Sequence, residues 1–256
     1  MKVSFIAPPY LRYYSAVTDF HLVPAHHVTH FGYEIQNFWV QMSARGDYVI
    51  VDNGVTERGY AMNAAELVTI AHDISANCIV IPDTFDDAEK TNSEMQTNID
   101  SILHLLPPDY APDLMAVVHG KTEDEWIESY KLVSSNQAVR IIGLPKVMER
   151  NFESRTSFLR RIEEQGLIDH QHGRRHHLLG VWSTPDDIVT TAMQLDWVDS
   201  IDTSVPVMLG INGVTMTPHS NKISLNEATF ADPHPETTLQ NMAAFMRIMN
   251  YSPGGY

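Results

Sequence analysis

A chain of 256 residues, 43% of them hydrophobic, is long enough to bury the core of one domain, and no Gly/Ser-rich or Pro-rich linker divides it. Its one cysteine, Cys78, excludes an internal disulfide and a zinc site built from several cysteines, and it suits a reducing cytoplasm. The formal net charge of −15 argues against a large phosphate-binding surface, although the Arg and Lys residues between Arg140 and Arg175 could still form a local basic groove.

Short runs rich in β-branched residues alternate with helical segments along the chain, which predicts parallel strands joined by crossover helices. Helix starts are indicated by Asn63, Thr122 and Thr184. Eight such units favour a single (β/α)8 TIM-barrel domain over residues 1–256, with an open doubly wound sheet as the main alternative. The predicted strands are Val3–Ala7, Tyr48–Asp52, Cys78–Pro82, Leu114–Val118, Arg140–Leu144, His177–Val181 and Val198–Asp202, with an eighth near Lys222–Leu225.

Residues 10–47 interrupt this pattern, because they are rich in aromatic residues and histidine but show no clear periodicity. We expect this stretch to cover one mouth of the barrel, as a substrate-covering segment or as a structural plug. The apolar run before it breaks at Pro8-Pro9 and is too short for a signal peptide. No stretch approaches the length of a membrane helix, so we expect a cytoplasmic protein without a membrane partner.

Polar residues stand at the ends of several predicted strands. Active sites of parallel barrels form at the carboxyl ends of the strands, so these side chains should converge on one mouth. A single aspartate after a strand is most often a helix cap or turn residue, but several on one face are the equipment for cleaving a glycosidic bond. One carboxylate attacks the anomeric carbon, and the other carries the proton of the leaving group. The strand-end groups are Asp52-Asn53-Gly54, Asp83, His119-Gly120, Gly143-Leu144 and Asp202.

At these positions the sequence resembles the tRNA-guanine transglycosylase superfamily, and most closely its short phage-type branch, which installs 7-deazaguanine derivatives in DNA. The similar elements follow one another in the same order between about Val49 and Asp232. They are His177–Ile188, which resembles LMGVGTPDDI with one residue inserted; Ser200–Pro206, which resembles the FDCVLP nucleophile strand; Asp52–Gly54, which resembles the DSGG turn; Asp83; Gly143-Leu144; and Asn226–Asp232, which resembles the segment before the family's zinc cysteines.

The resemblance implies an enzyme, a pentosyltransferase that exchanges guanine for a 7-deazaguanine such as preQ0 through a covalent glycosyl-aspartate. It places the nucleophile on Asp202 and the general acid/base on Asp52. Asp83 would read the guanine edge, and the backbone of Gly143 and Leu144 would line the base pocket. The chemistry then requires an ionised Asp202 and a raised pKa for Asp52.

Two departures from the family modify this expectation. The Val-Gln-Gly of the family's fourth strand is Val118-His119-Gly120 here, so His119 would contact the base in place of glutamine, with Gly120, Asn53 and Gly54 nearby. The zinc cysteines are missing after Asp232, which makes DNA a better candidate than tRNA. A homodimer or a basic partner protein would help so acidic a chain approach nucleic acid, as would a confined basic groove or the pair Arg174-Arg175.

The histidines cluster at 21–30 and at 170–177, but neither cluster has the two-ligand helix spacing with a carboxylate that typifies a zinc site. We therefore predict no metal and no cofactor, and assign the first cluster to substrate contact or packing. Two other functions remain open. One is a non-catalytic paralogue that binds nucleic acid or a partner. Asp52, Asp83 and Asp202 argue against it, because a protein that only binds has no need of a nucleophile. The other is a barrel glycoside hydrolase. It is disfavoured because sugar sites usually have aromatic platforms, and of the four tryptophans only Trp182 lies beside a predicted strand end.

Overall fold

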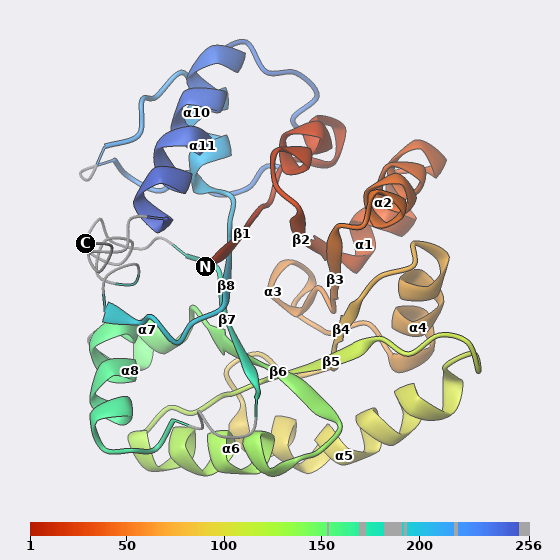
Figure 1. The fold of residues 1–256 in the computed structure, drawn as a ribbon, viewed down its shortest axis with the longest axis vertical. Coiled ribbons are helices and arrows are strands. Elements are labelled where there is room, and N and C mark those ends of the chain that lie inside the picture. Colours follow the sequence, from red (N-terminus) through yellow and green to blue (C-terminus); the bar gives the residue numbers. More distant parts are fainter. Residues whose placement is uncertain (153, 169–172, 182–190, 192–193, 218–219, 251–256) are drawn as a thin grey trace.

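A computed structural model describes residues 1–152, 154–168, 173–181, 191, 194–217 and 220–250. Its strands form one eight-stranded parallel sheet in the order β1-β8-β7-β6-β5-β4-β3-β2, which curls into a nearly closed barrel with helices between the strands, consistent with the predicted TIM barrel (Figure 1). The strands are β1 Lys2–Phe5, β2 Phe20–Pro24, β3 Tyr48–Asp52, β4 Cys78–Val80, β5 Asp113–Val117, β6 Val139–Pro145, β7 Arg175–Leu179 and β8 Ser200–Thr203.

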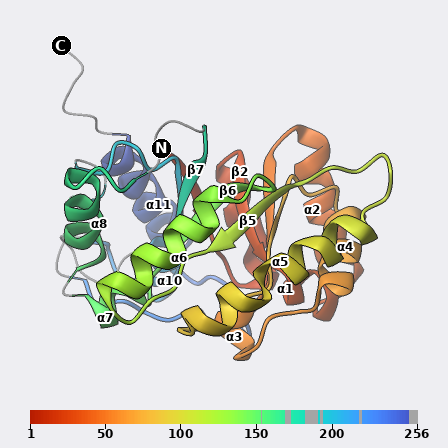
Figure 2. The same ribbon diagram turned by 90° about the horizontal axis from the view of Figure 1, so that it is seen from below.

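Helices surround the sheet, and α5 and α6 lie side by side along the outside of β5 and β6 (Figure 2). Each buries one apolar face, as Trp126 and Tyr130 show in α6, where both are almost inaccessible. The helices are the 3-10 helix η1 Pro9–Val17, then α1 Ala25–His30, α2 Tyr33–Arg45, α3 Val55–Arg58, α4 Ala64–Asp73, α5 Ala88–Leu105, α6 Glu123–Ser135, α7 Met148–Asn151, α8 Arg155–Glu164, α10 Val205–Ile211 and α11 Pro235–Met249.

One predicted strand is wrong. Lys222–Leu225 lies outside the sheet, and the missing barrel strand is β2, Phe20–Pro24, within the stretch that we expected to be irregular. Residues 10–47 therefore contribute η1, β2, α1 and α2 to the barrel wall, instead of forming only a cover over its mouth. Strand β2 was hidden because a histidine and a proline interrupt its apolar run, yet all five of its residues are buried.

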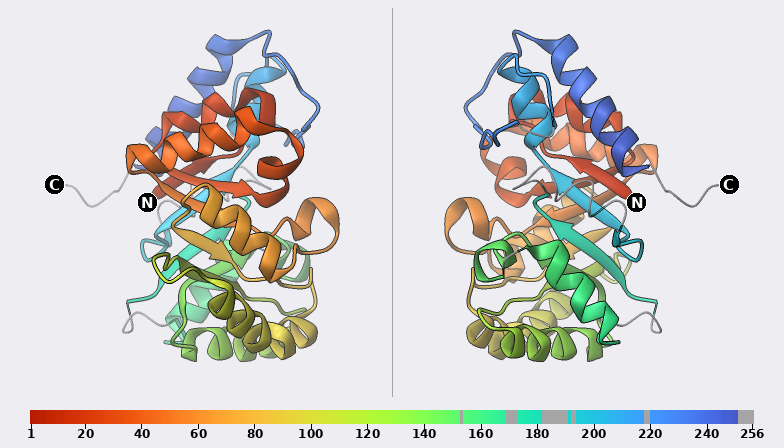
Figure 3. Two further views of the ribbon diagram at one scale, coloured as in Figure 1. Left: turned by 90° about the vertical axis from the view of Figure 1, so that its right-hand side faces the viewer. Right: turned by 90° about the vertical axis from the view of Figure 1, so that its left-hand side faces the viewer.

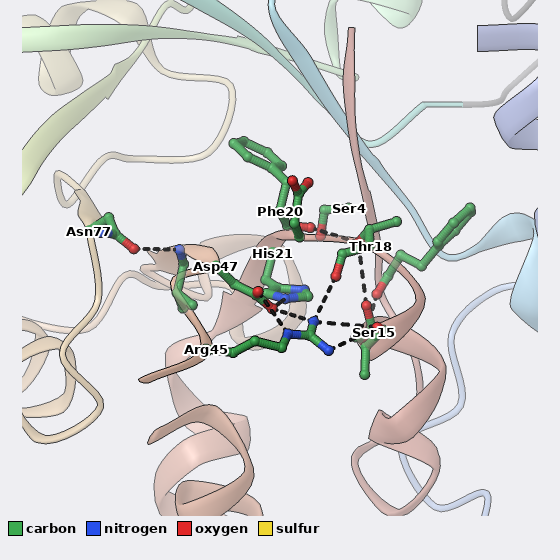
Figure 4. Close-up of polar contacts among 12 residues, drawn as sticks. Ser4, Ser15, Thr18, Phe20, His21, Arg45, Asp47 and Asn77 are labelled. Atoms are coloured by element: carbon green, nitrogen blue, oxygen red, sulfur yellow. Dashed lines mark hydrogen bonds and ion pairs between the residues drawn. The ribbon is translucent and has the colours of Figure 1, made fainter. Parts of the chain in front are cut away.

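The seam between β1 and β2 closes through a side chain. Ser4 Oγ accepts a hydrogen bond of 2.7 Å from the Leu22 backbone N–H, where the other neighbouring strands are joined by backbone ladders. Below this seam, the carboxylate of Asp47 is buried and accepts hydrogen bonds from Arg45 and from His21, whose Nε2 lies 2.6 Å away (Figure 4). Burial of polar groups is tolerable because they satisfy one another, and the cluster fixes the start of β2.

Two of the predicted helix starts are confirmed. Asn63 caps α4 in a reciprocal capping box with Glu66, and the Thr122 hydroxyl caps α6 by accepting from the Glu125 N–H. The third, Thr184, lies outside the described residues.

Polar side chains close the amino-terminal end of the barrel. Tyr48, Asp113 and Arg175 begin the alternate strands β3, β5 and β7, and their side chains meet: the Tyr48 hydroxyl donates to Asp113 at 2.7 Å, and Arg175 pairs with Asp113. Arg175 thus lies at the end opposite the expected active site, and Arg174 beside it donates to the Val139 carbonyl. This position gives no support to the prediction that the arginine pair contacts substrate phosphate, which stays a prediction.

The last helices pack tightly against each other and against β1. A Cβ on Gly210 of α10 would lie only 2.2 Å from the Thr238 Cα of α11, so this crossing needs a glycine. The Phe245 ring of α11 packs edge-on against Phe5 of β1 with centroids 5.9 Å apart, and the blue helices α10 and α11 lie together at the top of the molecule (Figure 3). In the described part of the chain, none of the helices is both long enough and apolar enough to cross a membrane.

Candidate active site at the carboxyl ends of the strands

The polar residues predicted from strand ends do converge on one mouth of the barrel. Asp52 is the last residue of β3 and is level with Pro24 of β2, whereas Asp202 lies in β8 level with Ser4 of β1. Asp83 follows β4, and the negative charges of Asp83 and Asp202 both act on Asp52. All strands run parallel, so this mouth is the carboxyl end at which barrel enzymes place their catalytic groups.

Asp202 is held as a hydrogen-bond acceptor. Its Oδ1 accepts 2.9 Å from the Gly180 backbone N–H and lies 3.2 Å from His177 Nε2, and the residue is 4% exposed. The other ring nitrogen of His177, Nδ1, lies 2.8 Å from the Ser200 hydroxyl. When that hydroxyl donates to Nδ1, the neutral imidazole carries its proton on Nε2 and donates it to Asp202.

The two oxygens of Asp202 differ in their contacts. Within the described part of the chain, Oδ2 receives no hydrogen bond, whereas Oδ1 is anchored by Gly180 and His177. An anionic carboxylate with one anchored and one unengaged oxygen is suited to attack an electrophilic carbon. Sequence reasoning gave His177 no role in the site, because it was counted only among the clustered histidines at 170–177.

Asp52 has the opposite electrostatic setting. Burial in the mouth raises its pKa well above the usual value, and the charges of Glu57, Asp83 and Asp202 raise it further, against the hydrogen bond that Gly54 N–H donates to Oδ2 at 3.0 Å. Gly54 adopts φ +76°, a left-handed conformation that glycine tolerates, and so turns its N–H back toward the carboxylate. A carboxyl group whose pKa is raised in this way can hold a proton and act as a general acid.

Glu57 joins this acidic group from the exposed short helix α3, and no sequence signal marked it. Desolvation in the mouth raises its pKa, and the charges of Asp202 and Glu227 also raise it. Glu227 belongs to the segment that resembles the family's Asn226–Asp232 element, and it comes from the far end of the chain. The mouth therefore gathers several carboxyl groups whose proton affinities depend on one another.

Asp83 is the centre of a buried polar network. Its Oδ1 accepts from Asn53 Nδ2 at 2.6 Å, and its Oδ2 lies 2.6 Å from His119 Nε2. Asn53 is itself fixed by donating to the Ile81 carbonyl at 2.9 Å. His119, 2% exposed, therefore acts on Asp83, and its Nδ1 is buried with no partner among the described residues. Sequence reasoning placed Asp83 and His119 near the substrate and made no prediction about a contact between them.

Three of the predicted pocket residues are needed for packing. Leu144 is fully buried in the core between the sheet and the helices, and its carbonyl accepts from Arg155 at 3.2 Å. Gly143 faces the barrel interior, where an added Cβ would lie 3.1 Å from Leu179 Cδ1. Gly120 is needed for close approach, since its Cβ would lie 2.4 Å from the backbone nitrogen of Trp126. The predicted backbone contacts with substrate stay predictions.

A cavity of about 520 Å³ opens beside Asp83, between the segment after α3 and helix α5. Tyr60 and Phe85, which are 60% and 40% exposed, are among its lining residues. The guanidinium of Arg58 lies over the Tyr60 ring at 4.3 Å from its centroid. Exposed aromatic rings and arginine planes beside a pocket are suited to stacking a planar base.

Several of the arginines expected to form a basic groove in the middle of the chain are instead buried or paired with acidic residues. Arg155 is buried, and Arg160 and Arg161 of the same helix form ion pairs with Glu164 and Glu123. Lys146, directly after β6, is different, because its stem packs beside Gly180, next to the loop that holds Asp202. Partial burial and the nearby charge of Lys222 lower the pKa of Lys146 to about 8. This lysine pair is a concentration of positive charge close to the loop that holds Asp202.

Comparison with known proteins adds no identification, since the sequence matches none of the family models and none of the curated proteins.

Proposed function

We propose that this protein is a base-exchange transglycosylase that replaces guanine in DNA with a 7-deazaguanine through a covalent glycosyl-aspartate. The observation that carries the proposal is the contrast between Asp202 and Asp52 in one mouth. Asp202 is anchored through one oxygen by Gly180 and His177, with its other oxygen unbonded among the described residues, whereas burial and neighbouring negative charges favour the protonated form of Asp52. Paired carboxyl groups in opposite protonation states are what glycosidic cleavage needs.

The two chemical steps follow from this pair. Asp202 Oδ2 attacks C1′ of a flipped-out nucleotide, the bond from C1′ to guanine N9 breaks, and the proton of Asp52 neutralises the departing base. A 7-deazaguanine then occupies the same space and gives its N9 proton to Asp52. Its N9 attacks C1′ and displaces Asp202, so the two inversions produce net retention and restore both carboxyl groups.

Recognition of the base is assigned to the network around Asp83. Its carboxylate, held by Asn53 and His119, can accept from the N1–H and the 2-amino group of a guanine-like edge, which adenine does not offer in that pattern. The cavity beside it has aromatic lining residues for stacking. Lys146 and Lys222 would meet a phosphate next to the reacting nucleotide, a confined contact that a chain of net charge −15 can provide without a broad basic surface.

The test is exchange of labelled guanine, and separately of preQ0 and related 7-deazaguanines, into guanine-containing DNA, followed by nucleoside mass spectrometry. A tRNA arm distinguishes the two nucleic acids. Asp202→Asn and Asp52→Asn should each abolish exchange, whereas Asp73→Asn, an exposed aspartate at the end of α4, serves as the matched control and should keep it. Denaturing electrophoresis of wild type with DNA and no incoming base should reveal the covalent adduct, absent in Asp202→Asn.

Failure to exchange any base into DNA or tRNA, from a folded wild-type chain, would overturn the proposal and favour the non-catalytic paralogue. Release of a free sugar end from an oligosaccharide that depends on the same two aspartates would instead indicate a glycoside hydrolase.

A further inference from the structure

Two neighbouring histidines in the mouth direct their ring nitrogens at one carboxylate oxygen. His26 Nε2 and His27 Nε2 each lie 2.8 Å from Oε1 of Glu227, about 200 residues later in the chain. The side chains of His26 and His27 are 5% and 4% exposed, and that of Glu227 is 33% exposed. Adjacent residues of a helix normally point in different directions, so this convergence at the first turn of α1 is a specific arrangement.

Both imidazole rings are held in place by packing. A Cβ on Gly54 would lie 3.2 Å from His26 Nδ1, so the ring rests against the turn that carries Asp52. The His27 ring packs edge-on against Phe31 with centroids 5.7 Å apart. The two Nε2 atoms are therefore fixed before any ligand arrives, whereas Glu227 reaches them from a partly exposed loop. A preorganised pair of nitrogens with one adjustable carboxylate is typical of a metal site.

We infer that His26, His27 and Glu227 form a binding site for Zn²⁺ or a similar divalent transition metal. The three ligand atoms lie within 4.8 Å of one another, close enough to share one ion. Two imidazole nitrogens and one carboxylate are a common three-ligand set for zinc, with a fourth position left for water or a substrate atom. The acidic surroundings, in which Glu57 interacts with both His26 and Glu227, add long-range attraction for a dication.

The metal would join the loop that carries Glu227 to the end of β2, at the rim of the mouth. The same loop is already held at Asp232, whose carboxylate accepts from the hydroxyls of Tyr14 and Thr238. With both attachments made, the loop is fixed at two points on either side of residues 228–231. The alternative without metal is a pair of N–H donors sharing one carboxylate oxygen, and it predicts no stoichiometric metal binding.

The test uses the full chain, stripped of metal with a chelator and then dialysed against Zn²⁺ or Co²⁺. We expect about one equivalent of metal by elemental analysis, ligand-field absorption from bound Co²⁺, and a higher melting temperature with Zn²⁺. His27→Ala and Glu227→Gln should lose the equivalent and the absorption. Glu227→Gln keeps the size of a partly exposed side chain, so it reports on the site even where His27→Ala fails to fold.

The matched control is His30→Ala, because His30 is exposed and its ring lies 6.2 Å from that of His26 without belonging to the ligand set. It should bind metal like the wild type. Less than a tenth of an equivalent in the wild type, or equal binding in Glu227→Gln, would overturn the inference. Because the readouts are metal content and absorption, the result is independent of whether the chain exchanges bases.

Discussion

Arg155 offers a sharp test of how the mouth is held together. Its side chain is fully buried in α8, and among the described residues its guanidinium donates to three backbone carbonyls at the ends of β6 and β7. The bonds measure 3.2 Å to Leu144, 2.8 Å to Leu179 and 3.1 Å to Gly180. Gly180 in turn donates its N–H to Asp202, so the arginine supports the loop that anchors the proposed nucleophile.

We predict that Arg155→Met lowers the free energy of unfolding by about 3 kcal/mol. Hydrogen bonds from a charged donor contribute about 1.5 kcal/mol each at the low end, so three contribute roughly 4.5 kcal/mol. Relief of the buried guanidinium's desolvation offsets part of that loss. Arg155→Lys should be no better, because an ammonium is a point donor and cannot span three carbonyls in the plane of a guanidinium fork.

Urea denaturation followed by tryptophan fluorescence and circular dichroism measures these differences. Arg160→Met is the matched control on the same helix, since Arg160 is about half exposed and pairs with Glu164 four residues on; it should change stability by no more than about 0.5 kcal/mol. If Arg155→Lys stays within about 1 kcal/mol of the wild type, a single donor suffices and the account of three cooperating bonds is wrong.

Three further outcomes are expected. Glu57→Gln removes a negative charge that raises the pKa of Asp52, so the alkaline limit of base exchange should move to lower pH in a rate profile, and an unchanged limit would contradict the coupling. Gly210→Ala should cost about 1–3 kcal/mol or more in urea, because its Cβ would meet the α11 backbone at 2.2 Å. Burial lowers the pKa of His21, and Asp47, despite its burial, has its pKa lowered by hydrogen bonds from Arg45 and His21. The free energy of unfolding should therefore fall as pH drops below about 6.5, because His21 binds a proton in the unfolded chain but not in the folded one. It should fall again at the lower pH where Asp47 protonates. Melting temperatures that rise on acidification would refute this.

The sequence could predict those parts of the fold that local patterns determine. Asn63 and Thr122 cap their helices by accepting hydrogen bonds from backbone N–H groups three positions on, so both partners are close together in the sequence. Seven of the strands combine apolar runs with polar ends, and their parallel order follows from the intervening helices. Convergence of Asp52 and Asp202 then follows from topology alone, because parallel strands end on the same side.

The errors arise where a polar side chain is buried against a distant partner. His21 interrupts the apolar pattern of β2, but the fold accommodates it because Asp47, 26 residues later, accepts its hydrogen bond. The run at Lys222–Leu225 has the alternation of a strand, yet β1 and β2 already meet across the nearly closed seam through the Ser4–Leu22 hydrogen bond, and the run stays outside the sheet. The local pattern of apolar residues shows only that a segment can form a strand. Whether it does so depends on whether a neighbouring strand has a free edge to pair with.

The same reasoning explains why the histidines in residues 21–30 looked uninformative. Metal motifs that can be read from a sequence place two ligands at a fixed helical spacing, and His26-His27 does not have that spacing. The third group, Glu227, lies in the segment between α10 and α11, which Asp232 holds through hydrogen bonds from Tyr14 and Thr238. Contacts separated by 200 residues depend on where the last barrel unit ends, which is a property of the closed fold and not of any segment within it.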